Sequence, residues 1–202
     1  MLRKTKLQFR QRQDIQQNGV QATPPFISIC EVINTIAPTF TDYGLEFQYL
    51  YARESTDLIV VHHTGNPSDD DLSAEQIHCA HIYNNGWAGI GYHYVVRKDG
   101  SIEFGRPEWA IGSHAYGYNF NSIGVHVCGN FEIADPTPQQ IESTAYLIGW
   151  LCDKYGLIPT AETVKAHRDL MPTACCGENL YNQLQTIRGK AIWYEQNYQG
   201  GD

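Results

Sequence analysis

Two histidines and a cysteine in this chain have the residue types and spacing to hold a metal ion that hydrolyses a bond. His62 ends a run of aliphatic and β-branched residues at 58–61. His167 and Cys175 follow more than a hundred residues later and lie eight positions apart. Imidazole nitrogens and a thiolate are ligands that zinc prefers, and three protein ligands leave the fourth tetrahedral position open. The set therefore predicts a catalytic zinc site, because a structural zinc site is closed by four protein ligands.

The segments around these residues predict an α/β fold. His62 lies at the end of a predicted buried strand over 57–63, and His167 follows a short predicted strand over 163–166. Further strands are predicted over 91–97, 101–105 and 122–128, and helices over 73–84, 137–155 and 178–194. A turn at 98–100 joins two of these strands as a hairpin. We expect a mixed central sheet of about five to six strands flanked by helices, with the zinc site at the sheet edge in a groove.

The helix over 137–155 has the strongest start and stop signals in the chain. Thr137 can cap its N-terminus, Pro138 suits the first helical position, and Gln140 completes a capping box. Gly156 follows the last turn, where a left-handed residue ends many helices. These signals predict both ends of the helix without reference to the rest of the fold.

The first 45 residues differ in character from the remainder. The first twenty are polar and rich in glutamine, and prolines interrupt the chain at 24, 25 and 38. We predict an N-terminal accessory segment over 1–45, partly disordered or packed on the main domain, and a catalytic domain over 46–202. No apolar stretch follows the basic start as a secretory signal requires, so we predict a protein that is cytoplasmic as synthesised.

Composition excludes several classes of function. The net charge of −8 argues against a broad nucleic-acid surface. No apolar run approaches the roughly 18 residues that span a bilayer, so no membrane insertion is expected. The six cysteines form no Cys-x-x-Cys pair, which argues against a zinc ribbon and fits a reducing compartment.

Six short motifs occur in an order that resembles a known family. They are His62-His63-Thr64, Gly91-Tyr92-His93-Tyr94, Lys98-Asp99-Gly100, Gly112-Ser113-His114-Ala115-x-Gly117-Tyr118-Asn119, Asn121-Ser122-Ile123-Gly124-Val125 and His167-Arg168-Asp169-x-x-Pro172-Thr173-x-Cys175. The chain from 53 to 193 resembles the type 2 N-acetylmuramoyl-L-alanine amidases, which include phage amidase lysins and the peptidoglycan recognition proteins of animals. Any one motif is weak, but the six in order are specific.

The resemblance implies one zinc ion bound by His62, His167 and Cys175. It leaves His63 outside the ligand set, which agrees with strand alternation because neighbouring side chains point to opposite faces. Cys176 stands where relatives often carry proline, and it is the alternative thiolate or a spare thiol beside the metal. For each histidine taken alone, the simpler interpretation is a hydrogen-bonded core residue.

The resemblance also implies roles for four other residues. Tyr92 is expected to face the metal site and to hydrogen-bond the developing oxyanion. Thr173 stands where phage relatives often carry lysine, and its hydroxyl is expected to stabilise the same charge. His114 and Asn119 lie in the long loop over 107–121 and are expected to bind substrate, with a purely structural role for His114 as the alternative.

These implications add up to a zinc amidase domain over 46–202 that hydrolyses the amide between N-acetylmuramic acid and L-alanine. A monomeric phage or prophage endolysin that acts on the cell wall after release is the expected biology. Two alternatives stay open: a peptidoglycan-binding module without catalysis, and an amidase that also regulates a protein partner such as phage RNA polymerase. A zinc peptidase of the commonest kind is disfavoured, because the chain lacks His-Glu-x-x-His.

Overall fold

The computed structural model describes residues 38–197. These residues all belong to one compact unit, Asn34–Asp202. The expected accessory segment over 1–45 therefore lies mostly outside the described residues. Its last eight residues are described, and they include a short strand that the sequence pattern did not predict.

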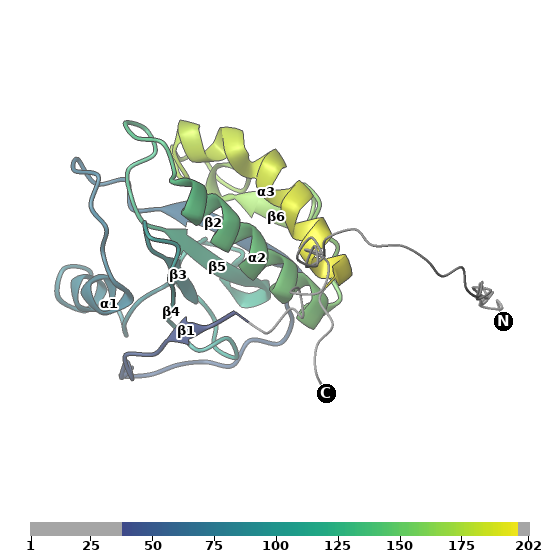
Figure 1. The fold of residues 1–202 in the computed structure, drawn as a ribbon. Coiled ribbons are helices and arrows are strands. Elements are labelled where there is room, and N and C mark those ends of the chain that lie inside the picture. The colour runs from purple at the N-terminus through teal and green to yellow at the C-terminus, as the bar shows by residue number, and fades with distance from the viewer. Residues whose placement is uncertain (1–37, 198–202) are drawn as a thin grey trace, which may run out of the picture. The chain divides into compact units, whose positions relative to one another are not determined.

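The centre of this unit is a mixed sheet of six strands in the order β1-β4-β3-β5-β2-β6 (Figure 1). The strands are β1 (Phe40–Thr41), β2 (Leu58–His63), β3 (Tyr94–Val96), β4 (Ile102–Phe104), β5 (Ser122–Val127) and β6 (Val164–Ala166). Only the β3–β4 hairpin is antiparallel within this order, and the other neighbours run parallel. The predicted mixed sheet is confirmed.

Three helices accompany the sheet: α1 (Ala74–Tyr83), α2 (Pro138–Tyr155) and α3 (Glu178–Asn197). Helices α2 and α3 lie side by side over one face of the sheet, and α1 lies apart from them (Figure 1). The predicted caps of α2 are present, since the Thr137 hydroxyl accepts from the Gln140 N–H and Gly156 is left-handed with φ of 65°. Short 3₁₀ turns, η2 (Asn119–Asn121) and η3 (His167–Asp169), precede β5 and follow β6.

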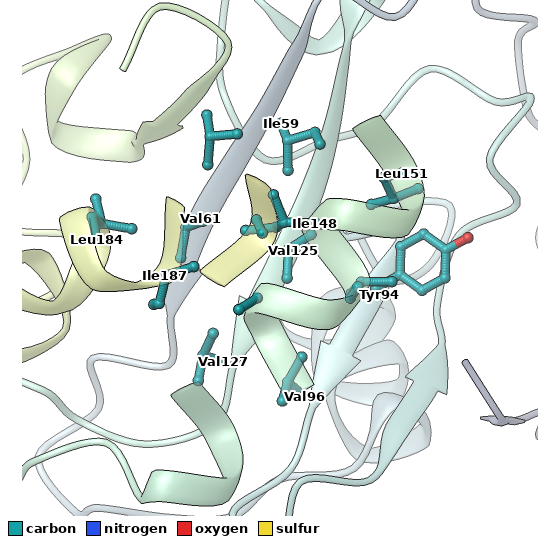
Figure 2. Close-up of a cluster of buried hydrophobic side chains, with 14 of the residues drawn as sticks. Ile59, Val61, Tyr94, Val96, Val125, Val127, Ile148, Leu151, Leu184 and Ile187 are labelled. Carbon is teal, nitrogen blue, oxygen red and sulfur yellow. The ribbon is translucent and has the colours of Figure 1, made fainter. Parts of the chain in front are cut away.

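Strand alternation divides β2 between two environments. Ile59 and Val61 are fully buried against α2 and α3, where they meet Ile148 of α2 and Ile187 of α3 (Figure 2). His62 directly follows Val61 in the strand and therefore points to the opposite face of the sheet. The helix-covered face holds the main core, so the opposite face is left to carry a functional site.

The predicted strand over 91–97 is shorter in the structure, because regular pairing starts only at Tyr94. The backbone before it stays bonded to both neighbours: the His93 N–H donates to the Gly124 carbonyl, and the Arg106 N–H donates to the Tyr92 carbonyl. Gly91 lies so close to the Ser113 carbonyl that a Cβ there would be only 2.1 Å from its oxygen. This close approach of the 113 loop accompanies the departure from strand pairing at Tyr92.

Candidate active site

The structure brings together the three residues expected to bind a metal ion. One ligand atom from each of His62, His167 and Cys175 lies within 4.8 Å of the others. His62 comes from the carboxyl end of β2, and His167 starts the η3 turn directly after β6. Because β2 and β6 are parallel neighbours, their carboxyl ends lie at the same edge of the sheet. Cys175 then returns on the loop between η3 and α3.

The geometry and chemistry of this group suit a zinc-sized ion. The Nδ1 atom of His62 lies 3.6 Å from the Cys175 Sγ atom. Donors bound to one tetrahedral zinc, at about 2.05 Å for nitrogen and about 2.3 Å for sulfur, are separated by about 3.6 Å. A set of two imidazoles and a thiol, with no carboxylate among them, favours zinc over magnesium or calcium.

The neighbouring residues His63 and Cys176 point elsewhere. The His63 Nδ1 atom accepts a hydrogen bond from the Phe131 N–H at 3.2 Å, and the two rings stack with their centroids 6.1 Å apart. Cys176 is fully buried in the core beneath α2 and α3. The thiol that faces the two histidines is therefore Cys175, whose Sγ atom also accepts from the His63 backbone N–H at 3.4 Å.

Burial sets the charge state of this group. It is the largest cause that lowers the pKa of the His62 and His167 imidazoles below 6.5, so both are neutral ligands at physiological pH. Burial also raises the pKa of the Cys175 thiol to about 12. A bound cation reverses that preference, because a thiol that coordinates a metal ion loses its proton. The three side chains are therefore neutral by themselves, and only a bound cation would convert Cys175 to a thiolate.

Tyr92 lies beside His62, and its expected role toward the metal stays a prediction. Its ring centroid is 5.1 Å from that of His62, and the ring also stacks on His126 with the centroids 4.7 Å apart. Burial is the largest cause that raises the pKa of its phenol, followed by the nearby Cys175. Tyr92 therefore stays protonated at neutral pH and can donate a hydrogen bond to a developing negative charge.

Thr173 lies on the loop that carries Cys175. Its side chain is exposed, and its hydroxyl oxygen accepts from the Cys175 N–H at 3.2 Å. That contact orders the backbone next to the thiol. The hydroxyl hydrogen is left to donate elsewhere, so the stabilising role expected for Thr173 stays a prediction.

His114 and Asn119 occupy positions that differ from the open groove in which substrate contacts were expected. His114 is buried behind His62, and its Nδ1 atom is 3.0 Å from the His62 Nε2 atom. The Asn119 side-chain oxygen accepts from the backbone N–H groups of His114 and Ala115, both at 2.8 Å. Both side chains are thus used within the protein.

A cavity of about 150 Å³ that the sequence did not reveal is linked to Tyr92 through two ring contacts. Its walls include Tyr49, Tyr51 and Trp87, and the buried Arg106 lies among its lining residues. The ring centroids of Trp87 and His81 are 4.7 Å apart, and those of His81 and Tyr92 are 5.7 Å apart. These residues come from separate parts of the chain without a shared motif, so only the tertiary structure shows that they are neighbours.

Comparison with known proteins supplies a family and several relatives. Residues 52–178 match the family described as N-acetylmuramoyl-L-alanine amidase. The chain is 35% identical to the endolysin of Escherichia phage T7 over 150 residues, which cover 72% of this chain and 89% of that protein. It is 31% identical to peptidoglycan-recognition protein SC2 of Drosophila melanogaster, over 63% of this chain and 71% of that protein.

Solved structures show the same fold. The endolysin N-acetylmuramoyl-L-alanine amidase LysCS from Clostridium intestinale URNW superimposes with a TM-score of 0.68 at 34% identity, covering 75% of this chain and 95% of that one. Wild-type Drosophila PGRP-LB superimposes with a TM-score of 0.63 at 24% identity, covering 70% and 87%. The six-stranded sheet with its helices is therefore an arrangement shared with both groups of proteins.

Proposed function

The chain belongs to the N-acetylmuramoyl-L-alanine amidase family, and we propose that it is a zinc-dependent peptidoglycan amidase that cleaves the bond between N-acetylmuramic acid and L-alanine. The observation that carries the zinc dependence is the meeting of His62, His167 and Cys175 in one group, which includes no fourth His, Cys, Asp or Glu among the described residues. Three ligands of this kind characterise a catalytic zinc site.

Three residues of the site would act as metal ligands. His62, His167 and Cys175 would hold the ion, and zinc when bound supplies a Lewis acid that activates water and polarises a carbonyl. Cys175 acts as a ligand and not as a nucleophile, since a thiolate held by a metal ion is not free to attack. Hydrolysis of the amide bond therefore needs no covalent enzyme intermediate.

Tyr92 is the group best suited to stabilise the negative charge that develops on the carbonyl oxygen. Its phenol is protonated at neutral pH and adjoins His62. A donor aimed at an oxyanion in a partly dry site is typically worth about 10²–10³ in kcat. We propose that the Thr173 hydroxyl adds a second donor, because its oxygen accepts from the Cys175 N–H and its hydrogen is left to donate.

We further propose that the enzyme is a phage or prophage endolysin that meets its substrate in the cell wall. The support is the set of endolysin relatives, since the aligned region covers 89% of the length of each of two phage endolysins. Across residues 38–197, no helix is long and apolar enough to cross a membrane. We propose that the protein is a monomer and that it binds peptidoglycan and not nucleic acid.

Digestion of purified peptidoglycan followed by mass spectrometry tests the proposal. We expect free stem peptides that begin with L-alanine, lost with a chelator and restored by added zinc. Intact wall with bound protein would instead support a recognition module without catalysis. Stem peptides released equally well in the presence of chelator would show an amidase that does not need the metal.

A further inference from the structure

The second ring nitrogen of His62 has a specific partner inside the protein. The Nδ1 atom faces Cys175 at 3.6 Å, and the Nε2 atom lies 3.0 Å from the Nδ1 atom of His114. A histidine that binds a metal through one nitrogen must carry its proton on the other. Partners of that second nitrogen orient the ring and fix its tautomer. His114 occupies this position behind His62.

A chain of hydrogen bonds determines in which direction His114 acts. The Ser122 hydroxyl donates to the Tyr118 carbonyl at 2.6 Å, since a carbonyl can only accept. The Ser122 oxygen is then the acceptor for the His114 Nε2–H at 3.4 Å. With its proton on Nε2, His114 presents the lone pair of Nδ1 to His62. The His62 proton therefore belongs on Nε2, and its Nδ1 lone pair is free to face the metal position.

The ring of His114 is held in place by its surroundings. It lies between two glycines, and a Cβ atom would come within 2.5 Å of the ring at Gly112 and within 2.6 Å at Gly124. The Asn119 side chain accepts from the His114 backbone N–H, which holds the loop on which the ring is carried. Any larger residue at either glycine would displace the ring from His62.

We propose that His114 is a positioning residue that holds His62 in the tautomer and orientation needed to bind the metal ion through Nδ1, with Ser122 and the Tyr118 carbonyl setting the direction of the hydrogen bonds. The inference rests on the proposed zinc dependence for its functional meaning. In this role His114 contacts the metal ligand His62 and does not contact the substrate. Asn119 then supports His114 through its backbone.

Two substitutions of nearly equal shape separate this role from a purely structural one. Asn in H114N places an oxygen acceptor at the same δ position as the histidine Nδ1, whereas Leu in H114L places a methyl group there. We expect H114L to bind zinc about 10–100-fold more weakly in a chelator competition, as for other partners of metal-ligating histidines. H114N should stay within about threefold of the wild type, since only the acceptor is required.

Nitrogen NMR of the metal-free protein supplies a readout that does not involve catalysis. We expect His62 and His114 of the wild type to carry their protons on Nε2, and His62 to keep this tautomer in H114N and lose it in H114L. Thermal unfolding of the metal-free variants checks that both substitutions cost similar stability. His78→Leu is a matched control, because His78 is a buried residue of α1 that packs on Phe47, and its loss should affect stability without changing zinc affinity.

The outcomes separate the inference from the function on which it rests. Equal zinc affinity of H114L and H114N, or a wild-type His62 with its proton on Nδ1, would overturn the positioning role and leave the amidase intact. A wild-type protein that binds no zinc would overturn the zinc dependence, while the tautomers of His62 and His114 would still decide whether the hydrogen-bond chain exists.

Discussion

At the scale of single residues, two adjacent cysteines have opposite environments. Cys175 faces the two histidines, and Cys176 is buried in the core. The Cys175 Sγ atom lies 3.6 Å from the His62 Nδ1 atom, whereas Cys176 packs in the core, so only the Cys175 thiol faces the metal position. The distinction makes the ligand assignment testable by paired substitution.

Replacing Cys175 by Ser should remove zinc binding and amidase activity together, because a hydroxyl is a much poorer zinc ligand than a thiolate. Zinc content by atomic absorption and release of stem peptides would be measured on the same preparation. Cys176→Ala is the control, and it should retain both properties with only a loss of stability from the small cavity. Full activity of C175S would contradict the assignment.

Tyr92→Phe removes one hydroxyl and keeps the ring packed between His62 and His126. We expect kcat to fall by about 10²–10³ with little change in KM, because the phenol acts on the charge that develops in the transition state. Zinc affinity should be unchanged, since Tyr92 is not a ligand. A Y92F enzyme with an unchanged kcat would show that another group stabilises the oxyanion.

At the scale of elements, the site depends on the parallel pairing of β2 with β6 and on the helices that hold this sheet. Helix α2 packs against α3, and together they cover the core face from which Ile59 and Val61 project. The start of α2 is tied to the β3–β4 turn as well, because the Thr137 hydroxyl donates to the Lys98 carbonyl at 2.8 Å. One side chain therefore caps the helix and docks it on the sheet.

Thr137→Ala should destabilise the protein by about 1 kcal/mol, which is the usual cost of losing such a cap. Thr137→Ser keeps the hydroxyl and should restore most of that stability. Urea unfolding followed by circular dichroism would measure both. Equal stability of T137A and the wild type would show that the cap and the bond to Lys98 contribute nothing to the folded state.

At the scale of the whole molecule, the sheet face that carries the site is unusually rich in buried histidine. His93 and His126 are both buried there, and burial lowers their pKa values from 6.5 to about 4 and about 3. The His93 ring donates to the Ala110 carbonyl and accepts from the Gly124 N–H, so it is satisfied only in its neutral form. The folded state therefore favours the uncharged forms of His93 and His126.

Acid should therefore destabilise the metal-free protein below neutral pH. Between pH 6.5 and about 4 the unfolded chain binds protons that the folded His93 excludes, so stability is present above pH 6.5 and falls as the pH decreases. His93 alone should account for a loss of roughly 2 kcal/mol between pH 7.5 and pH 5. Urea titrations at the two pH values would measure the loss, and H93Q, although less stable overall, should show a smaller one. An equal loss in H93Q would contradict this origin.

Much of the fold could be predicted from local sequence. The aliphatic run before His62, the capping box at Thr137 and the glycine at 156 are signals that act over a few residues, and the structure has β2 and α2 where they indicate. The two-residue strand β1 was not predicted, because pairing with β4 and not its own residues makes Phe40–Thr41 a strand. The late start of regular pairing at Tyr94 was likewise not predicted, and it accompanies the close approach of Gly91 to the Ser113 carbonyl.

The residue types and the order of the motifs predicted which residues could bind a metal, because both are properties of the linear chain. How these residues meet became visible only in the folded protein. His167 and Cys175 reach His62 because β6 pairs with β2 across a hundred residues of intervening chain, and His114 lies behind His62 because Gly112 and Gly124 leave room for its ring. Such contacts arise from long-range packing, which no spacing along the chain encodes.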